Sequence, residues 1–308
     1  MGNNYKPFKN ILSLIDVTSL TFMLVLVGFL AQIHDLNPYT DRLVSFYAIV
    51  TIFVAAIAYF RYKNPNPSYN LIYLLGSIAI FLGLYESISG LLPIYTGGKT
   101  YDVWIDNLDK SILGVSPTVW LQKFTFPLLT EILYIFYFIY FLMPVVLVTI
   151  LFRRKKYYDT EVSVLTLFIN YYGAYILYFF VPVQGPRLHL AQQHIVPLDG
   201  YFFAGHIRDI INFFEPSTLD CFPSLHTSIV IIVTLLAAKF YKRIYKLYLF
   251  LSFVIIFSLI YLRYHYILDV LAGALWAFVS FYLAIGLHKR YHHKFQNLLV
   301  HQTHNNGK

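Results

Sequence analysis

Long apolar runs recur along this chain of 308 residues and limit what it can fold into. A helix needs about 20 mostly apolar residues to cross a bilayer, and eight stretches come near that length. They are residues 11–33, 43–60, 71–95, 128–152, 161–183, 224–238, 247–264 and 266–287. The sequence therefore predicts an all-α fold, a polytopic membrane helical bundle with about eight transmembrane helices.

Composition supports a membrane protein. Charged residues make up only 12% of the chain, against about 25% in soluble domains. The first apolar run has no small-residue cleavage site, so we expect it to remain as a membrane helix. The single cysteine, Cys221, excludes an internal disulfide framework and a Cys-rich zinc site, and we expect it to be a buried or interfacial thiol.

The basic residues predict the orientation, because Lys and Arg are enriched on the cytoplasmic side. If the N-terminus is placed inside, 16 of the 23 basic residues fall in inside segments. The outside residues are Arg42, Lys99, Lys110, Lys123, Arg187, Arg208 and Arg263. Both termini are therefore expected in the cytoplasm. This placement explains the net charge of +8 by topology and contact with anionic lipid, so we expect no nucleic-acid partner.

Two outside loops are long. Residues 97–126 combine Trp104 and Trp120 with interleaved aspartates at 102, 106 and 109, which predicts an amphipathic segment lying in the membrane interface. Residues 183–222 contain Gly185-Pro186-Arg187 and several histidines. A long loop beside a membrane site often forms its lid or mouth.

Three polar stretches fall on this same outside face. They are Gly185 to Arg187, Phe222 to His226 and Tyr261 to Asp269. Their convergence on one side of the membrane predicts a single site.

His265 and Asp269 are four residues apart, so on a helix they share one face. Asp269 then accepts a hydrogen bond from one ring nitrogen of His265, which makes the other nitrogen a better nucleophile. An ionisable side chain in an apolar run is costly and points to function. A purely structural His–Asp pair at a helix junction is the alternative.

Pro223, Ser224 and His226 open the sixth predicted helix. Proline suits a first helical turn, the free N–H groups there attract anions, and the Ser224 hydroxyl adds to them. His226 is placed to give a proton to a leaving oxygen. The alternative is that Ser224 is only a cap and His226 only an interfacial histidine.

Two arginines complete the predicted site. Guanidinium groups bind phosphate oxygens in pairs and stay charged, and phosphoryl transfer depends mainly on positioning and charge stabilisation. Arg187, Arg263, the helix N-terminus and the two histidines meet this demand without a metal, so we expect no cofactor. Zinc bound by His226 and His265 is the competing interpretation, which the lack of Cys partners disfavours.

These motifs resemble the signatures of the type-2 phosphatidic acid phosphatase superfamily. Pro223 to His226 is similar to its second signature, Pro-Ser-x-His, and His265 to Asp269 is similar to the His-x-x-x-Asp of its third. The resemblance implies that His265 forms a phosphohistidine, that Asp269 orients it and that His226 is the general acid. Arg187 resembles the arginine of the first signature.

Three signature positions differ. The lysine seven positions before the first-signature arginine is Phe180 here, and the proline after that arginine is Leu188. The arginine of the third signature is Leu259. Arg263 lies one helical turn nearer the surface on the same face, where it could supply the missing charge.

These departures resemble the inositol phosphorylceramide synthase branch. The segment from Ile105-Asp106 to Gly114, followed by Pro117 and Trp120-Leu121-Gln122, is also similar to that branch. The resemblance covers roughly residues 102–287. It leaves an N-terminal pair of membrane helices (1–70), a catalytic membrane bundle (71–287) and a basic cytoplasmic tail (288–308).

We therefore expect an integral membrane phosphotransferase or phosphatase that acts on a lipid phosphate or phosphodiester at the extracytoplasmic face. The expected partners are a lipid substrate and a second lipid or a polyol acceptor. A lipid hydroxyl as acceptor gives a head-group transferase, which the branch resemblance favours. Water as acceptor gives a phosphatase of phosphatidic acid or of a polyprenyl (pyro)phosphate. No motif decides between the two acceptors.

Two other classes compete. A membrane transporter could use Glu86, Asp269 and the histidines as a proton relay, but the paired broken helices expected of transporters are not evident. A catalytically silent lipid-binding or scaffolding protein is the third class. The complete set of two histidines and an aspartate weighs against it.

Overall fold

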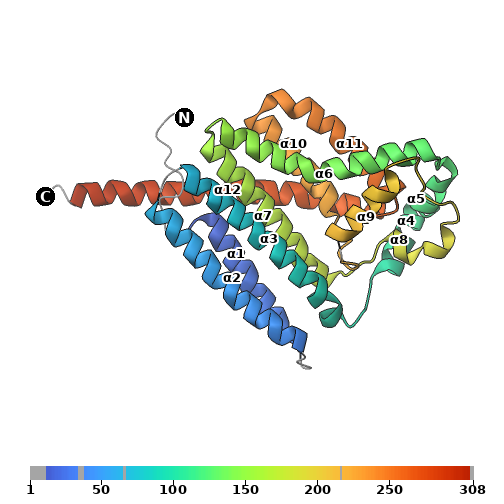
Figure 1. The fold of residues 1–308 in the computed structure, drawn as a ribbon, viewed down its shortest axis with the longest axis horizontal. Coiled ribbons are helices and arrows are strands. Elements are labelled where there is room, and N and C mark those ends of the chain that lie inside the picture. The colour runs from blue at the N-terminus through green and yellow to red at the C-terminus, as the bar shows by residue number, and fades with distance from the viewer. Residues whose placement is uncertain (1–11, 34–37, 65–66, 216, 306–308) are drawn as a thin grey trace.

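The computed structural model describes residues 12–33, 38–64, 67–215 and 217–305, which fold almost entirely into helices (Figure 1). In chain order they are α1 (Leu14–Leu30), α2 (Pro38–Lys63), α3 (Pro67–Thr96), α4 (Asp102–Leu113), α5 (Pro117–Leu121), η1 (Gln122–Phe124), α6 (Pro127–Arg153), α7 (Tyr157–Phe180), α8 (Pro186–His189), η2 (Ala191–Gln193), α9 (Ala204–Phe214), α10 (Leu225–Phe240), η3 (Lys242–Ile244), α11 (Tyr245–Tyr261) and α12 (Ile267–Asn305). Within these ranges there is no β-strand, only an isolated bridge between Val183 and Asp220. The all-α prediction is confirmed.

Among the described residues, six helices are long and apolar enough to cross a membrane, as expected of an integral membrane protein. They are Pro38–Lys63, Ile72–Thr96, Pro127–Arg153, Tyr157–Phe180, Lys242–Tyr261 and Ile267–Tyr291. Each overlaps a predicted segment. The other two predicted segments coincide with the shorter apolar helices α1 and α10, of 17 and 16 residues, so the count of about eight stays a prediction. Ile11, Lys6, Lys9 and Lys308 lie outside the described residues.

Helix α10 is the centre of the bundle. It packs against α6, α7, α11 and α12, and the side chains of Ile229, Val233 and Leu236 are fully buried. Its sequence is apolar on all sides, as expected of a helix enclosed by other helices. Because its first turn begins at Leu225, the Pro-Ser-x-His motif lies at one end of this central helix.

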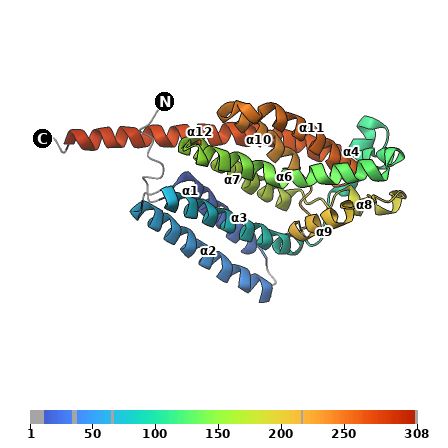
Figure 2. The same ribbon diagram turned by 45° about the horizontal axis from the view of Figure 1, so that its top comes forward.

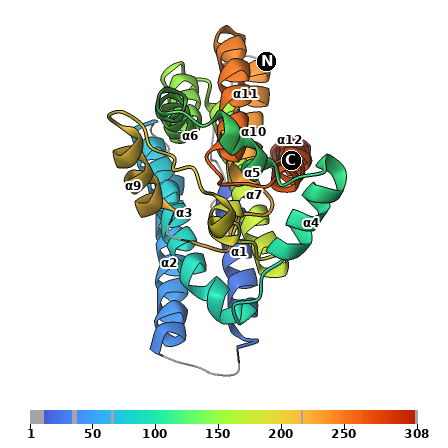
Figure 3. The ribbon, with the colours of Figure 1, turned by 90° about the vertical axis from the view of Figure 1, so that its right-hand side faces the viewer.

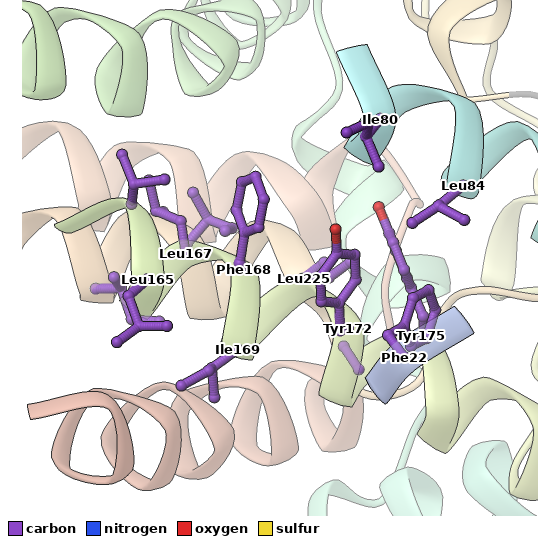
Figure 4. Close-up of a cluster of buried hydrophobic side chains, with 14 of the residues drawn as sticks. Phe22, Ile80, Leu84, Leu165, Leu167, Phe168, Ile169, Tyr172, Tyr175 and Leu225 are labelled. Atoms are coloured by element: carbon purple, nitrogen blue, oxygen red, sulfur yellow. The ribbon is translucent and has the colours of Figure 1, made fainter. Parts of the chain in front are cut away.

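Helices α1 to α3 pack together beside α7 (Figure 2). Their contact with α7 is largely aromatic: the rings of Phe22 and Tyr172 stack with centroids 4.4 Å apart. Figure 4 shows Ile80 and Leu84 of α3 close to Tyr172 and Tyr175 of α7. Helix association inside a membrane depends on such van der Waals packing, since lipid tails are as apolar as the side chains.

The short helices gather at one end of the molecule. Helices α4, α5, α8 and α9 surround the end of the bundle that is opposite to the C-terminal part of α12 (Figure 1). Seen from this end, α4 and α9 lie on opposite sides (Figure 3). The long loops predicted on the outer face therefore meet around one end of the bundle.

Helix α4 is amphipathic, but its polar face is the one that packs against the protein. Asp102, Asp106 and Asp109 are buried, with at most 3% of each side chain exposed, whereas Trp104 and Ile112 are 56% and 65% exposed. The carboxylates thus point into the protein and the apolar side chains point outward. Such an outward apolar face suits contact with lipid, and the interfacial position of this segment stays a prediction.

A close approach between α12 and the start of α10 gives a stability test. A Cβ at Gly273 would collide with the Ser224 carbonyl oxygen, whereas a Cβ at Gly286 in the same helix has nothing within 4 Å. We expect Gly273→Ala to destabilise the protein by about 1–3 kcal/mol through overpacking. Gly286→Ala should be neutral or stabilising by up to about 1 kcal/mol, because alanine favours helix more than glycine does.

The measurement is thermal unfolding of both purified variants in detergent beside the wild type. Equal midpoints for the two variants would contradict the close approach of α12 to Ser224.

Candidate active site

Two histidines from distant parts of the chain are in direct contact. Nδ1 of His226, in the first turn of α10, lies 3.2 Å from Nε2 of His265, in the loop between α11 and α12. The ring centroids are 5.3 Å apart. They meet because α10 packs against both α11 and α12.

The second ring nitrogen of His265 faces a buried carboxylate and a thiol. Nδ1 lies 3.4 Å from Oδ2 of Asp269 and 3.1 Å from Sγ of Cys221. The same Oδ2 accepts hydrogen bonds from the Cys221 thiol at 3.0 Å and from the N–H of Tyr266 at 2.8 Å. Asp269 thus lies behind His265, as the four-residue spacing predicts, and Nε2 is left facing His226.

Asp269 also has an unused acceptor. Its side chain is fully buried, and Oδ1 has no hydrogen-bond partner among the described residues. A buried unpaired carboxylate oxygen is costly, and such features tend to mark functional sites.

His226 is backed by a carboxylate of its own. Its Nε2 lies 2.8 Å from Oε1 of Glu215 and 2.7 Å from the hydroxyl of Tyr137, which also donates to Oε2 of Glu215 at 3.0 Å. Burial favours the neutral form of Glu215, but the neighbouring His226 outweighs it and lowers the pKa of this carboxyl group. Each histidine therefore presents one nitrogen to the other ring and the opposite nitrogen to a carboxylate.

Cys221 has more polar contacts than its isolation in the sequence suggests. Burial and the adjacent Asp269 carboxylate raise the pKa of its thiol well above the ordinary value, so it acts as a hydrogen-bond donor and not as a thiolate. Ligand atoms of Cys221, His265 and Asp269 all lie within 4.8 Å of one another. This is the group in the described chain that could hold a metal ion, and it differs from the His226–His265 pair considered from sequence.

Asp102 of α4 fixes the loop that carries Arg187. Its two carboxylate oxygens accept the backbone N–H groups of Gln184 and Gly185, each at 2.9 Å. Gly185 has a φ of 89°, which favours glycine, and a Cβ there would crowd the Tyr264 carbonyl oxygen. The first predicted motif is therefore held against the third by its backbone.

Asp109 fixes the start of α12 in the same way, through backbone N–H groups. Its carboxylate accepts the N–H groups of Ile267 at 2.9 Å and Leu268 at 3.2 Å. These are the first two residues of the helix that carries Asp269. A carboxylate in this position satisfies the free donors of a helix start.

The two predicted arginines lie beyond Tyr264 and do not touch the histidine pair. Arg187 is half-buried, donates to Oδ1 of Asn212 at 2.7 Å and stacks 4.8 Å from the Tyr264 ring centre. Arg263 is 8% exposed and donates to the Val196 carbonyl at 2.5 Å. Its φ of 68° is a left-handed conformation that costs on the order of 1–3 kcal/mol for a residue other than glycine.

Ser224 is the N-cap of α10. Its Oγ accepts hydrogen bonds from the N–H of Thr227 at 3.2 Å and from the Thr227 hydroxyl at 3.0 Å, and the side chain is fully buried. Its own N–H donates to the Asp269 carbonyl at 3.0 Å. Ser224 thus ties the second motif to the third, and its hydroxyl proton is not used in these bonds.

Sequence reasoning missed Glu215 and Tyr137, which contact His226. Glu215 follows α9 directly, and α9 is held on α6 by Glu131, which accepts the N–H groups of Phe202 and Phe203 at 3.2 and 2.5 Å. No motif marks these residues. The available signal was helical spacing within the loop, since Ala204, Ile211 and Glu215 recur on one face of α9.

Glu86, the residue that a proton relay would need, lies apart. Its side chain is exposed on α3, and no contact joins it to His226, His265 or Asp269 among the described residues. The hydroxyl of Tyr85, its neighbour, instead donates to Oδ2 of Asp220 at 2.9 Å.

Comparison with known proteins identifies the family. The model of the PAP2 superfamily matches residues 104–283, more than half of the chain and the part that contains both histidines. No curated protein and no solved structure matches the chain. The matched range covers the bundle from α4 to the first half of α12, together with the loops that meet at its end. The chain therefore belongs to the PAP2 superfamily, whose members are generally phosphatases and phosphotransferases of lipid phosphates.

Proposed function

We propose that the protein is an integral membrane enzyme that transfers the phosphorus-containing group of a lipid phosphate or phosphodiester through a phosphohistidine on His265. The observation that carries the proposal is the pair of facing nitrogens, with His226 Nδ1 3.2 Å from His265 Nε2 and a carboxylate behind each ring. This arrangement supplies a nucleophile and an acid to one phosphorus atom.

In the first half-reaction, Nε2 of His265 attacks phosphorus. The new P–N bond forms as the bond between phosphorus and the leaving oxygen breaks, and His226 gives its Nδ1 proton to that oxygen. In the second half-reaction, the acceptor hydroxyl loses its proton to His226 and attacks phosphorus, and the P–N bond breaks. Nitrogens in hydrogen-bond contact leave no room for phosphorus, so the two rings must separate when substrate binds.

Asp269 and Glu215 act as orienting carboxylates in this scheme. Asp269 accepts a hydrogen bond from the Nδ1–H group of His265 and so leaves Nε2 unprotonated for attack. Glu215 accepts a hydrogen bond from the Nε2–H group of His226, so the proton that is transferred sits on Nδ1. The Tyr137 hydroxyl, 2.7 Å from the same nitrogen, restrains the ring further.

We assign the substrate phosphate oxygens to Arg187, Arg263 and Ser224. The arginines supply positive charge at the mouth of the site, and the free hydroxyl proton of Ser224 adds a donor at the start of α10. With this charge supplied by the protein, the reaction needs no metal.

We further propose a head-group transferase of the inositol phosphorylceramide synthase type, with a lipid or polyol hydroxyl as acceptor. The support is the likeness of the segment around Ile105 to Gln122 and the replacement of the signature cations by Phe180 and Leu259. A lipid phosphate phosphatase shares every step except the acceptor. Lipid mass spectrometry of cells with wild type or His265→Ala separates the two: loss of a head-group lipid supports the transferase, and accumulation of a lipid phosphate supports the phosphatase.

We place the site on the extracytoplasmic face and both termini in the cytoplasm. Helix α10 begins at the histidines and ends at Phe240, whose carbonyl accepts a hydrogen bond from Lys156 Nζ at 2.8 Å. Arg154 lies 4.8 Å from the ring centre of Tyr241. This basic end favours the cytoplasmic side. We also propose three parts of the chain: an N-terminal helix pair (1–70), a catalytic membrane bundle (71–287) and a basic tail (288–308). Helix α12 crosses the last boundary, because it runs unbroken to Asn305.

Alanine substitutions of the two histidines should impair the reaction in different ways. His265→Ala should abolish both turnover and the acid-labile phosphoenzyme, because no nucleophile remains. His226→Ala should slow an alkyl phosphate lipid by about 10²–10⁴-fold, with partial rescue on p-nitrophenyl phosphate, whose leaving group needs little protonation. Asp269→Asn should also be severely slow, because the amide can favour the wrong tautomer.

Rapid trapping with labelled substrate measures the intermediate. Label that persists in His265→Ala and vanishes in His226→Ala would reverse the two roles.

Glu215 gives a test of the acid. We expect Glu215→Gln to lower turnover about 10-fold or more on an alkyl phosphate lipid, part of the roughly 10²–10⁴-fold that an acid contributes, and to change the pH profile. Glu215→Asp should recover part of the loss. Asp209→Asn, an exposed position on α9, is the matched control. A Gln variant with wild-type turnover and pH profile would remove Glu215 from the mechanism.

Chelation tests the absence of a metal. Turnover should survive EDTA, because the arginines and the α10 N-terminus provide the charge that a metal would otherwise supply. Complete loss on chelation, followed by recovery with one divalent metal, would instead assign a resident ion, for which Cys221, His265 and Asp269 are the available ligands.

A further inference from the structure

Three arginines converge on two tyrosines beside the histidine pair. Arg208 lies on α9 one helical turn before Asn212, and Asn212 Oδ1 accepts a hydrogen bond from Arg187 at 2.7 Å. Arg187, Arg208 and Arg263 all act electrostatically on the Tyr134 hydroxyl. Arg187 also stacks on Tyr264. We call these five residues the arginine cluster.

No carboxylate neutralises these arginines. In the described part of the chain, none of the ion pairs within 4.0 Å involves Arg187, Arg208 or Arg263. The hydrogen-bond acceptors of Arg187 and Arg263 are neutral: the Asn212 amide and the Val196 carbonyl. Like charges gathered without a counterion repel one another, and a bound anion would relieve that repulsion.

The neighbouring titratable groups leave this charge in place. His194 is the histidine close to Arg263, and burial together with that arginine lowers the pKa of His194 to about 4, so it is neutral at pH 7. Glu215 is the carboxylate that acts on Tyr264, and it is hydrogen-bonded to His226. The cluster therefore carries three positive charges.

Two donors in the cluster have no acceptor. Nε of Arg263 and the hydroxyl of Tyr264 are buried and have no hydrogen-bond partner among the described residues. More than nine-tenths of the Arg263 side chain is buried. Buried donors without partners are rare, and an oxyanion would satisfy both.

The cluster borders the reacting atoms. Tyr264 precedes His265 in the chain, and its ring centroid lies 4.7 Å from that of Tyr137. The Tyr137 hydroxyl in turn lies 2.7 Å from Nε2 of His226. The arginine cluster is therefore separated from the histidine pair by one aromatic ring, so a phosphate bound between the two would be within reach of both.

We propose that Arg208 is a third phosphate-binding arginine, and that with Arg187, Arg263 and Tyr264 it forms an anion subsite for the phosphate of the lipid head group. This inference rests on the proposed function. Guanidinium groups bind phosphate oxygens bidentately, and three of them suit a group with several charged oxygens. Phe180 and Leu259 stand where the signatures have a lysine and an arginine, so two positive charges are missing there. Arg208 supplies positive charge from α9, which lies outside every signature motif.

Binding of inorganic phosphate to the full-length protein in detergent, by calorimetry, tests the subsite without any turnover. We expect Arg208→Gln to weaken phosphate binding about 10- to 100-fold, the usual scale for one charge-assisted hydrogen-bonded contact. Arg208→Lys should recover part of the loss, because the charge remains without the fork. Arg42→Gln, an exposed arginine outside the cluster, is the matched control and should bind like the wild type.

A second variant tests the subsite in case Arg208→Gln does not fold correctly. Tyr264→Phe keeps the ring and removes only the unpartnered hydroxyl, so it should also weaken phosphate binding while its unfolding midpoint stays near that of the wild type. Wild-type affinity in both Arg208→Gln and Tyr264→Phe would overturn the subsite.

His265→Ala separates this proposal from the mechanism. It should bind phosphate but not turn over. If His265→Ala retained turnover while Arg208→Gln still weakened phosphate binding, the result would support the subsite and contradict the phosphohistidine mechanism.

Discussion

Buried carboxylates that accept backbone N–H groups hold the whole site together. Asp102 fixes the turn before Arg187, Asp109 fixes the start of α12, and Glu131 fixes the start of α9. An ionised carboxylate away from water needs several donors, and the free N–H groups of loops and helix starts provide them. Because each contact joins a helix of the bundle or its rim to a loop that carries chemistry, the placement of Arg187, His265 and Glu215 depends on them.

The sequence predicted what depends on short spacing along the chain. The four-residue spacing predicted Asp269 beside His265, which holds although His265 lies in the loop just before α12, and the helix start at Ser224 predicted His226 in a first turn. It did not predict what depends on how loops fold. The aspartates of α4 recur at helical spacing, but the sequence could not tell whether their face meets solvent or protein. Tertiary contacts with the loops decided it.

The same reasoning explains why α9 went unnoticed. Arg208 and Glu215 are seven residues apart, a spacing that matches two helical turns, but they lie in a long loop that no signature motif marks. Glu131 and the packing of α9 on α6 supply the order that local sequence lacks. The number of membrane spans stays a prediction for a related reason: α10 is only 16 residues long, and its enclosure by four helices does not depend on a span of full bilayer length.

Helix α9 and the residue directly after it thus supply both charged groups that lie outside the motifs. Arg208 belongs to the arginine cluster and Glu215 contacts His226, so we expect a displacement of α9 to change phosphate binding and acid orientation together. The helix is short, and its contacts to the bundle are few besides the Glu131 cap and α6. An anion in the arginine cluster would attract Arg208 electrostatically. This attraction would stabilise the position of α9 in which Glu215 contacts His226. Binding of the head group would then favour the arrangement of the acid that the chemical step requires, which is a use of binding energy at a distance from the reacting bond.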